Sequence, residues 1–591
     1  MKESIQVKRN LILLVAACFI LLLAVSFLSG CEKPYNPYTF VGEGTKENPY
    51  KISTKEDLIG LRTDVENKYT YFQKYFVLTS DIDLGGMVWA PIGTKDSSLA
   101  ACIDGDGYTI SNFKIENPTT TDCGFFANIW IDNNISDPAI KDLNISNATL
   151  IIKNNSTIAH NAALLIGSTN GKIVNCNVTG TIDVENSYFS SLGMVIGNSQ
   201  KDVENCVSDG EIKIKNPEYD VWHSQSQGVW FNIGGVVGNS NASIVSCTNR
   251  ADFNEDYILT DTSRIDAKHN NGGITGSMNS ANSFIRNCVN EGNINGIGRS
   301  AGIAANLYKA VVENCLNTGN ISSKSELSVD TGGIVGSGSE SVVRNCKNTG
   351  DVTITTKGRW WNGEVVIDGN NSNYYEMGTV GGVCASGGID IYYCVNTGDV
   401  TATGECIHYP GGIVGRADGD IYSSYSTGNV TGYSKYTNVM AAGITAVVEG
   451  NTQNGNIKIE NCFSTGFVQV LARAITDVHA GLAGPTPYAG GCFAYIHTTA
   501  NTLKNNVYVT NPSGTLDENH FTFNSWYSDD DEENSISSTI SLNRGVTMEE
   551  LTSGNPLAGF GTYIDAGDLI ENPENVWIYT EGELPKLYWE D

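Results

Sequence analysis

A repeated pattern of glycine, asparagine and cysteine constrains the fold of this chain more than any other feature. One unit reads Gly-Gly-Ile-Val-Gly, then roughly eight residues, then Asn-Cys-x-Asn-x-Gly-x-Val. Nine copies occur, at Asn175-Cys176, Asn205-Cys206, Ser246-Cys247, Asn287-Cys288, Asn314-Cys315, Asn345-Cys346, Tyr393-Cys394, Ser424-Tyr425 and Asn461-Cys462. The shortest spacings, Cys288 to Cys315 and Cys176 to Cys206, are 27 and 30 residues. Such a period indicates a solenoid, in which each coil buries its apolar face on its neighbours.

The pattern inside one unit predicts three short strands joined by three corners. Alternating Ile and Val in Gly-Gly-Ile-Val-Gly and in Gly-x-Val-x-Ile fit strands with one face inward. Asn-Thr-Gly and its variants are expected to supply the positive φ angles at the corners. We therefore predict an all-β chain that forms a single right-handed parallel β-helix of about 9–12 coils. A helical pattern is expected only at Thr54 to Leu61.

The repeats are flanked by segments without the pattern, which are candidates for the caps that an open stack of strands requires. We assign residues 42–115 to an N-terminal cap and first coil and residues 116–510 to the repeat β-helix. Residues 511–591 are assigned to a C-terminal coil and cap.

The first residues resemble a bacterial lipoprotein signal. Lys2, Lys8 and Arg9 precede an uncharged apolar run, which ends at Leu28-Ser29-Gly30-Cys31. Residues 1–30 are thus expected to be a signal peptide, and residues 31–41 a lipid anchor on Cys31 with a short tether. The alternative is a transmembrane helix. Acylation at Cys31 would tether the body outside the membrane, and Glu32 after it favours the outer membrane or cell surface.

The net charge of the chain argues against two kinds of partner, nucleic acids and anionic lipids. The chain has 36 basic and 65 acidic residues, a formal net charge of −29. Such an excess of negative charge argues against binding to nucleic acid and against an electrostatic hold on anionic lipids.

The repeat resembles the GLUG-motif repeats of bacterial surface proteins, which also occur in the non-catalytic β-helical part of IgA-specific metallopeptidases. Gly-Gly-Ile-Val-Gly and Asn-Cys-x-Asn-x-Gly carry the resemblance, as do Asp81-Ile82-Asp83-Leu84, Asp104-Gly105-Asp106-Gly107 and the ending Leu584-Pro585-Lys586-Leu587. The resemblance implies a β-helix and is weak for function, because such repeats are scaffold.

Thirteen cysteines follow Cys31, and eight of them occupy one repeat position. Stacked coils would place these thiols inward and close together. The same position is expected to hold Tyr425 in one unit, a substitution that an obligatory disulfide or metal site would not tolerate. We therefore predict a ladder of free, buried packing thiols. A zinc site has little support, since no Cys-x-x-Cys pair occurs.

Catalytic and metal-binding signatures are weak. The peptidase motif His-Glu-x-x-His does not occur. His269, His408 and His479 belong to separate coils and are expected at corners or on the surface. Asp104 to Gly107 is interpreted as a turn and Asp529 to Glu533 as a solvated loop, with Ca²⁺ as a minor alternative. We expect no cofactor.

The interruptions of the repeat are the best candidates for a binding site. Longer units carry extra residues after the Gly-x-Val strand, so the insertions should project from one face. Aromatic side chains in them can stack on sugars or anchor protein partners. The candidate ligand-binding residues are Trp222, His223, Trp230, Arg359, Trp360, Trp361, Tyr374 and Tyr375. A milder aromatic insertion lies at Tyr433 to Tyr436, and self-packing of the loops is the alternative.

These features favour a non-enzymatic surface adhesin or recognition lipoprotein, whose partner is an extracellular glycan or a host or bacterial surface protein. Two alternatives stay open. One is a carbohydrate-active β-helix enzyme, a polysaccharide lyase or hydrolase with catalytic carboxylates on the same face. The other is a structural spacer of the envelope.

Overall fold

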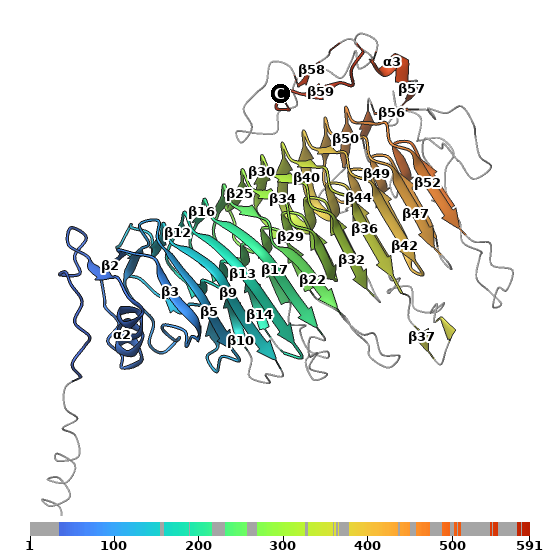
Figure 1. Cartoon of the computed structure of the whole chain (residues 1–591). Helices are drawn as coiled ribbons and strands as arrows, with labels where there is room; N and C mark the ends of the chain where they lie inside the picture. The colour runs from blue at the N-terminus through green and yellow to red at the C-terminus, as the bar shows by residue number, and fades with distance from the viewer. Residues whose placement is uncertain are drawn as a thin grey trace, which may run out of the picture.

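A computed structural model describes the chain from residue 35 onward, with gaps. The described residues are 35–153, 159–187, 189–215, 231–256, 269–325, 329–357, 360–361, 364–365, 377–434, 438–449, 457–472, 487–496, 502–504, 506–509, 544–546, 548–552, 576–578, 580 and 582–590. They form one elongated parallel β-helix (Figure 1). The near strands run downward while the chain advances from left to right, the right-handed sense that the repeat predicted.

Each coil passes through three sheets. The first, called here the glycine sheet, has eleven strands, one for each coil, within the range that the sequence predicted. Its strands are β6 (Asp122–Cys123), β10 (Ala159–Ala163), β14 (Phe189–Gly193), β18 (Phe231–Gly234), β23 (His269–Gly272), β28 (Arg299–Ala301), β33 (Val329–Gly332), β39 (Met377–Gly381), β43 (Ile407–Gly411), β48 (Val439–Ala442) and β53 (Pro487–Gly490).

The second sheet, called the bent sheet, receives two strands from most coils, one before and one after a turn. The strands before the turn are β7 (Phe126–Ile129), β11 (Ile166–Thr169), β15 (Ile196–Ser199), β19 (Val237–Ser240), β24 (Thr275–Met278), β29 (Ala304–Tyr308), β44 (Val414–Ala417), β49 (Thr445–Val448) and β54 (Phe493–Ile496). Those after it are β8 (Ile140–Lys141), β12 (Ile173–Val174), β16 (Val203–Glu204), β20 (Ile244–Val245), β25 (Phe284–Arg286), β30 (Val311–Glu313), β45 (Ile421–Tyr422), β50 (Lys458–Glu460) and β55 (Thr502–Lys504). Both parts are continuous in β34 (Val335–Arg344) and β40 (Cys384–Tyr392), and β1 (Tyr50–Ile52), β2 (Tyr75–Leu78) and β4 (Cys102–Asp104) begin the sheet.

The third sheet, called the long-strand sheet, follows the cysteine of each unit. Its early strands are β3 (Ile82–Val88), β5 (Thr109–Glu116), β9 (Asn144–Lys153), β13 (Asn177–Glu185) and β17 (Val207–Lys215). Later coils divide the strand in two, as in β21 (Thr248–Asn249) with β22 (Asp252–Asp256), β26 (Val289–Asn290) with β27 (Ile294–Ile297), β31 (Leu316–Asn317) with β32 (Ile321–Ser325), β35 (Lys347–Asn348) with β36 (Val352–Thr356), β41 (Val395–Asn396) with β42 (Val400–Gly404), β46 (Tyr425–Ser426) with β47 (Val430–Ser434) and β51 (Phe463–Ser464) with β52 (Val468–Ala472). The sheet ends at β56 (Val507–Val509) and β57 (Arg544–Val546).

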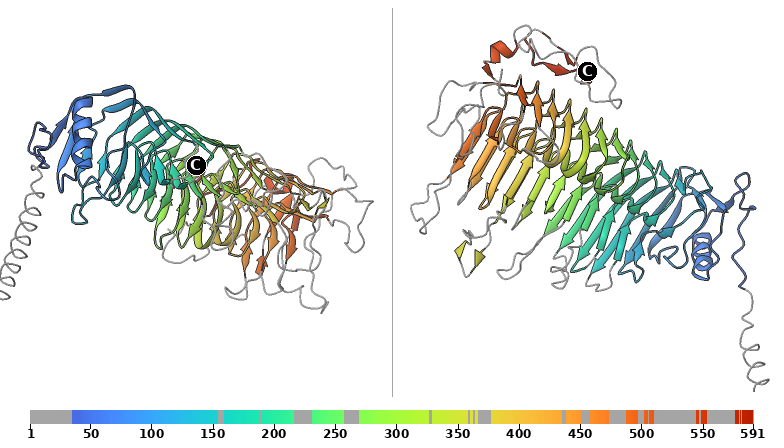
Figure 2. Two further views of the ribbon diagram at one scale, coloured as in Figure 1. Left: turned by 90° about the horizontal axis from the view of Figure 1, so that it is seen from below. Right: turned by 180° about the vertical axis from the view of Figure 1, so that it is seen from behind.

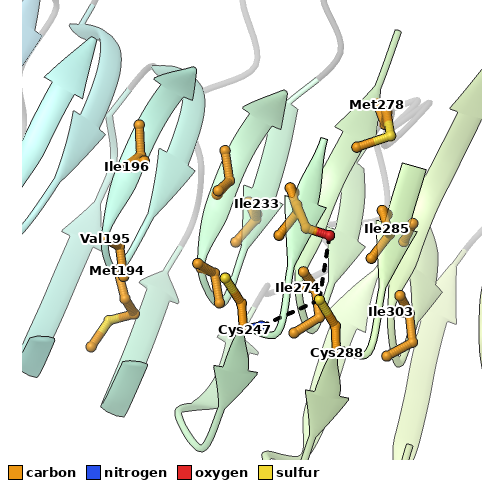
Figure 3. Close-up of a cluster of buried hydrophobic side chains, with 14 of the residues drawn as sticks. Met194, Val195, Ile196, Ile233, Cys247, Ile274, Met278, Ile285, Cys288 and Ile303 are labelled. Carbon is orange, nitrogen blue, oxygen red and sulfur yellow. Dashed lines mark hydrogen bonds between the residues drawn. The ribbon is translucent and has the colours of Figure 1, made fainter. Parts of the chain in front are cut away.

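Neighbouring coils stack in register, so equivalent residues of the repeat lie above one another. Asn177 to Glu185 pair one for one with Val207 to Lys215. Inward side chains therefore form continuous rows of isoleucine, valine and cysteine along the rod (Figure 3). Each inward side chain is covered by the equivalent side chains of the coils above and below it. The hydrophobic core therefore runs along the whole rod inside the coils.

A buried asparagine ladder explains the second asparagine of the motif. Asn249, Asn290, Asn317, Asn348 and Asn396 are all fully buried in the long-strand sheet. The first four side chains each donate one N–H to the asparagine Oδ1 of the next coil, as from Asn290 to Asn317 at 2.7 Å, and Asn396 donates to Ser426 Oγ at 3.2 Å. Each of the five donates its other N–H to the carbonyl two residues ahead, as from Asn317 to Gly319 at 2.9 Å. Both amide protons are thus satisfied inside an apolar core.

The thirteen cysteines after Cys31 are free and buried, as the repeat predicted. The backbone N–H of Cys247 donates to the Sγ of Cys288 at 3.4 Å, so the thiols of successive coils are stacked (Figure 3). One expectation about this row is wrong, because Ser424 rather than Tyr425 takes the cysteine position. Cys394 N–H donates to Ser424 Oγ at 3.0 Å, while Tyr425 pairs with Val395 on the outer side. A small polar side chain therefore fits the same inward space.

The positive φ angles lie at another place in the unit than the one predicted. The residue directly before the cysteine is left-handed, with φ of 55° at Asn175 and 56° at Asn287, whereas Gly319 and Gly350 of Asn-Thr-Gly have no positive φ. Asparagine tolerates this conformation better than most residues. The glycines are needed for close approach instead, since a Cβ on Gly350 would lie 2.0 Å from the Gly319 carbonyl oxygen.

The N-terminal end of the rod carries α2 (Lys55–Glu66), which begins where the sequence predicted and extends beyond Leu61. Thr54 caps it in a capping box with Asp57. Leu58, Leu61 and Val65 pack into the continuous core.

The C-terminal segment turns back along the side of the rod. After α3 (Met548–Thr552), the strands β58 (Trp577–Ile578) and β59 (Lys586–Leu587) pair with each other. They lie beside the middle coils (Figures 1 and 2). Trp577 packs on Tyr425 and Phe463, and Trp589 Nε1 donates to the Tyr393 carbonyl at 3.0 Å. The segment thus covers outer aromatic side chains of the later coils.

Candidate functional site

The long-strand sheet and the glycine sheet meet at one corner, called here the insertion edge. Long strands end there at Lys215, Asp256, Thr356, Ser434 and Ala472. The next glycine-sheet strands begin at Phe231, His269, Met377, Val439 and Pro487. The strand ends that flank these five insertions therefore lie along the same edge of the rod (Figure 2). Residues 130–139 and 449–457 instead separate strands of the bent sheet, and residues 510–543 separate β56 from β57.

Most of the predicted ligand-binding residues lie in these insertions, outside the described part of the chain. This applies to Trp222, His223, Trp230, Arg359, Tyr374 and Tyr375, and also to the predicted lipid attachment site Cys31. Trp360 and Trp361 form the two-residue strand β37, which pairs antiparallel with β38 (Glu364–Val365). Their role stays a prediction.

A cavity of about 420 Å³ opens at the insertion edge, beside the bases of two insertions. Lys324, Lys357, Glu405 and Tyr433 contribute to its lining. Strand pairing places Tyr433 next to Thr403 on the long-strand sheet. The cavity combines an aromatic ring, two cations and one carboxylate, which is a suitable set for a polar ligand.

Two buried polar contacts hold the bases of the insertions. Glu255, at the end of one long strand, contacts His269 Nδ1 at 2.8 Å and accepts a hydrogen bond from Asn271 Nδ2 at 2.9 Å. His269 begins the next glycine-sheet strand. Because both ends of the insertion at residues 257–268 are tied to each other inside the rod, its base is fixed by the scaffold.

The second contact joins Thr356 Oγ1 to His408 Nε2 at 2.8 Å. Burial lowers the pKa of His408 to about 4, because a charged imidazole would lose its hydration. His269 and His408 are at corners, as expected, but both are fully buried rather than on the surface. His479 lies outside the described residues.

Burial makes two of the thiols poor nucleophiles. Burial raises the pKa of Cys123 and of Cys462 to about 12, so neither forms the reactive thiolate at neutral pH. Among the residues that the structure describes, no group of three or more His, Cys, Asp or Glu side chains is placed to hold a metal ion.

The predicted turn at Asp104 to Gly107 is confirmed. Asp106 N–H donates to Asp104 Oδ1 at 2.9 Å, and Asp106 and Gly107 have positive φ. The acidic segment at Asp529 to Glu533 lies outside the described residues. In the described part of the chain, no helix has the length and apolar character to cross a membrane.

Sequence reasoning missed Trp130, an exposed aromatic side chain in the rod itself. Trp130 follows β7 and lines a cavity of about 700 Å³ at the N-terminal end. It lies in an early coil without the Asn-Cys pattern. The available signal was an isolated tryptophan directly after a short apolar strand, Phe126 to Ile129.

Comparison with known proteins places the repeat in a described family of motifs. The model of the GLUG motif matches residues 408–431. Two curated relatives share part of the sequence. A halomucin of Haloquadratum walsbyi is 27% identical over 174 residues, which are 27% of this chain and 2% of that protein. A candidate Gly-rich membrane protein of Evansella cellulosilytica is 38% identical over 91 residues, 14% of this chain and 10% of that protein.

The chain thus spans at most a tenth of the length of these relatives. A solved structure of a candidate immunoglobulin A1 protease from Bacteroides ovatus aligns with 15% identity, over 78% of this chain and 86% of that one. Its TM-score of 0.24 is too low to support an argument about fold or activity. The stacked coils and the matched segment agree with the repeat read from the sequence, and this chain is a parallel β-helix that carries the GLUG motif.

Proposed function

We propose that this chain is a non-enzymatic recognition protein of the bacterial cell envelope. In this proposal Cys31 carries the lipid anchor, and the β-helix is displayed at the outer membrane or cell surface. The insertion edge binds an extracellular glycan or a surface protein. The lipoprotein pattern before Cys31 supports the location, as do the names of the two relatives, one a mucin-like protein and the other a membrane protein.

One observation carries the binding role: five long insertions of the repeat, those after β17, β22, β36, β47 and β52, have their flanking strand ends along one edge of the scaffold. Solenoids commonly concentrate variable segments on one face, where neighbouring coils together form an extended binding surface. The buried Glu255–His269 and Thr356–His408 contacts fix the bases of this edge. The aromatic composition of the insertions provides side chains that stack on sugars or anchor a protein partner.

The test is binding of the mature body, residues 33–591, to an array of host and microbial glycans and to surface proteins. Replacing Trp360 and Trp361 together by alanine should abolish a selective signal without lowering the melting temperature. Tyr308→Ala is the matched control, because Tyr308 is an exposed aromatic side chain on the bent sheet.

Four outcomes would contradict parts of the proposal. Unchanged binding by the double variant excludes these tryptophans from the site, and a large drop in melting temperature shows that they pack within the fold. Release of reducing or unsaturated sugar from a polysaccharide would make the protein an enzyme. A mature chain that carries no acyl group on Cys31 would exclude the lipid anchor.

A further inference from the structure

The cavity beside Trp130, called here the Trp130 pocket, lies at the N-terminal end of the rod, away from the insertions after β17. Its volume of about 700 Å³ falls within the range of small-molecule sites, roughly 300–1,000 Å³. The lining includes Lys95, Asp96, Asp122, Asn128, Trp130 and Asn161. We infer that this pocket binds an uncharged oligosaccharide.

One wall is a segment of the N-terminal cap that lies against the first complete coil. Leu99 N–H donates to the Asn128 carbonyl at 3.1 Å, and Trp130 N–H donates to the Leu99 carbonyl at 2.8 Å. Leu99 also forms a parallel bridge with Ile129. The segment therefore continues the bent sheet by a partial strand, which fixes the backbone on both sides of Trp130.

The aromatic wall of the pocket is accessible. The Trp130 side chain is 44% exposed, although its backbone is held in the sheet. An indole that is accessible to solvent on an ordered backbone can pack on the C–H face of a sugar ring. An exposed tryptophan contributes little packing energy to the fold. The position of Trp130 in a pocket with polar side chains therefore favours a role in ligand contact.

The opposite wall is a preorganised set of polar groups. Asp122 is only 6% exposed and accepts hydrogen bonds from Asn128 Nδ2 at 3.0 Å and Asn161 Nδ2 at 2.8 Å. Ser98 Oγ donates to Asn128 Oδ1 at 2.7 Å. These contacts orient a carboxylate and two carboxamides that retain further acceptor and donor capacity. Sugar hydroxyls, which both donate and accept, match such a set.

The charge of the pocket selects against acidic sugars. Asp96 and Asp122 outnumber Lys95 in the lining, and the whole chain has a net charge of −29. A uronate or sialylated ligand would be repelled by this field. The expected ligand is therefore neutral.

A row of polar side chains continues from Asn161 toward the later coils, alternating between partly exposed and buried positions. Asn161 pairs with Ser191, Ser191 with Asn232, and Asn232 with Asn270, one step for each coil. Successive steps are separated by about 4.8 Å, the strand spacing of a sheet. Ser191 and Asn270 are buried, whereas Asn161 and Asn232, two coils apart, are partly exposed. These two amides can contact separate units of one sugar chain, which favours an oligosaccharide over a single sugar.

The inference deepens the proposed function and rests on it, while it places the contact in the rod rather than in the insertions. The full chain in detergent micelles is tested against uncharged gluco-, galacto- and N-acetylglucosamine oligosaccharides of increasing length. Sialylated and uronic acid oligosaccharides of the same lengths are the comparison. Trp130→Ala, Asn161→Ala and the equally exposed Tyr308→Ala are measured by calorimetric titration, with melting curves for each.

We expect binding of a neutral oligosaccharide that weakens about tenfold or more with Trp130→Ala, as for an aromatic anchor of a binding site. Asn161→Ala should also weaken it, and Tyr308→Ala should leave it unchanged. Binding that depends on Trp360 and Trp361 but not on Trp130 would overturn this inference and keep the proposed function. A preference for acidic sugars, or no saccharide binding by the folded chain, would also overturn it.

Discussion

At the residue scale, the cysteine row shows how a solenoid selects side chains. Each inward position is bounded by the same position of two neighbouring coils, so the space is set by the stack. Cysteine fills that space as a small apolar group. Ser424 occupies it in one coil by accepting a backbone hydrogen bond at 3.0 Å. Packing rather than thiol chemistry therefore accounts for the row.

His408 gives a prediction about acid stability. Its pKa is lowered by burial to about 4, from the usual value near 6.5, and its neighbours in the glycine sheet are Gly378 and Val439. The unfolded chain therefore takes up the proton first as the pH falls. The stability contributed by neutral His408 is fully present above about pH 6.5 and is lost progressively toward pH 4.

The variant His408→Gln cannot titrate. The free energy of unfolding of the natural chain should therefore fall, relative to this variant, by about 2–3 kcal/mol between pH 7 and pH 4.5. Denaturant titrations at a series of pH values measure the difference, in which the carboxylate contributions common to both chains cancel. Parallel pH profiles of the two proteins would show that His408 is hydrated in the folded state.

At the scale of the element, the asparagine ladder ties five coils together inside the long-strand sheet. Asn317→Ala would leave Asn290 Nδ2 without its acceptor and Asn348 Oδ1 without its donor, both of them fully buried. We expect a loss of about 2–4 kcal/mol in the free energy of unfolding. The amide N–H of Asn290 and the amide oxygen of Asn348 would stay buried without a hydrogen-bond partner, and their desolvation would no longer be compensated.

The matched control is Asn254→Ala, because Asn254 donates to Glu211 on the exposed face of the same sheet. That change should stay within about 0.5 kcal/mol. Denaturant unfolding followed by circular dichroism gives both values. Equal losses in the two variants would mean that water enters the ladder and satisfies the stranded groups.

At the scale of the whole molecule, the C-terminal segment adds contacts that nearest-neighbour stacking cannot supply. Stability in a solenoid is mainly a sum over adjacent coils. The segment at 576–590 instead contacts three coils at once, through Lys347, Tyr393 and Tyr425. Glu590 is central to it, with a side chain 4% exposed that pairs with Lys347 at 3.1 Å.

Glu590→Gln should therefore loosen this segment more than it destabilises the rod. It removes the ion pair while it keeps the shape of the side chain that accepts from Tyr425. We expect faster proteolysis within residues 576–590 and a loss of about 1–2 kcal/mol in the stability of the docked segment. The control is Lys586→Gln, whose ion pair with Glu583 is half exposed. If both variants resist protease equally, the aromatic contacts alone hold the segment.

The candidate site was predictable only in part. The position of the insertions follows from where the repeat is interrupted, and the structure places the strand ends that flank five of them at one edge. The cavity that includes Tyr433 depends on which side chains of four coils meet there. The Trp130 pocket forms where the N-terminal cap contacts the first coil. The periodic pattern of the sequence does not predict a contact of this kind.

The sequence by itself determined the β-helix, the inward thiols and the helix that Thr54 caps. Each of these depends on local periodicity or on a few adjacent residues, and stacking multiplies the same signal in every coil. Tertiary structure decided the register that puts Ser424 inward and Tyr425 outward, and the left-handed asparagine before each cysteine. It also decided where the C-terminal segment docks, because contacts such as that of Glu590 with Lys347 join residues 243 positions apart. Contacts of that range depend on the whole stack of coils, which no local pattern encodes.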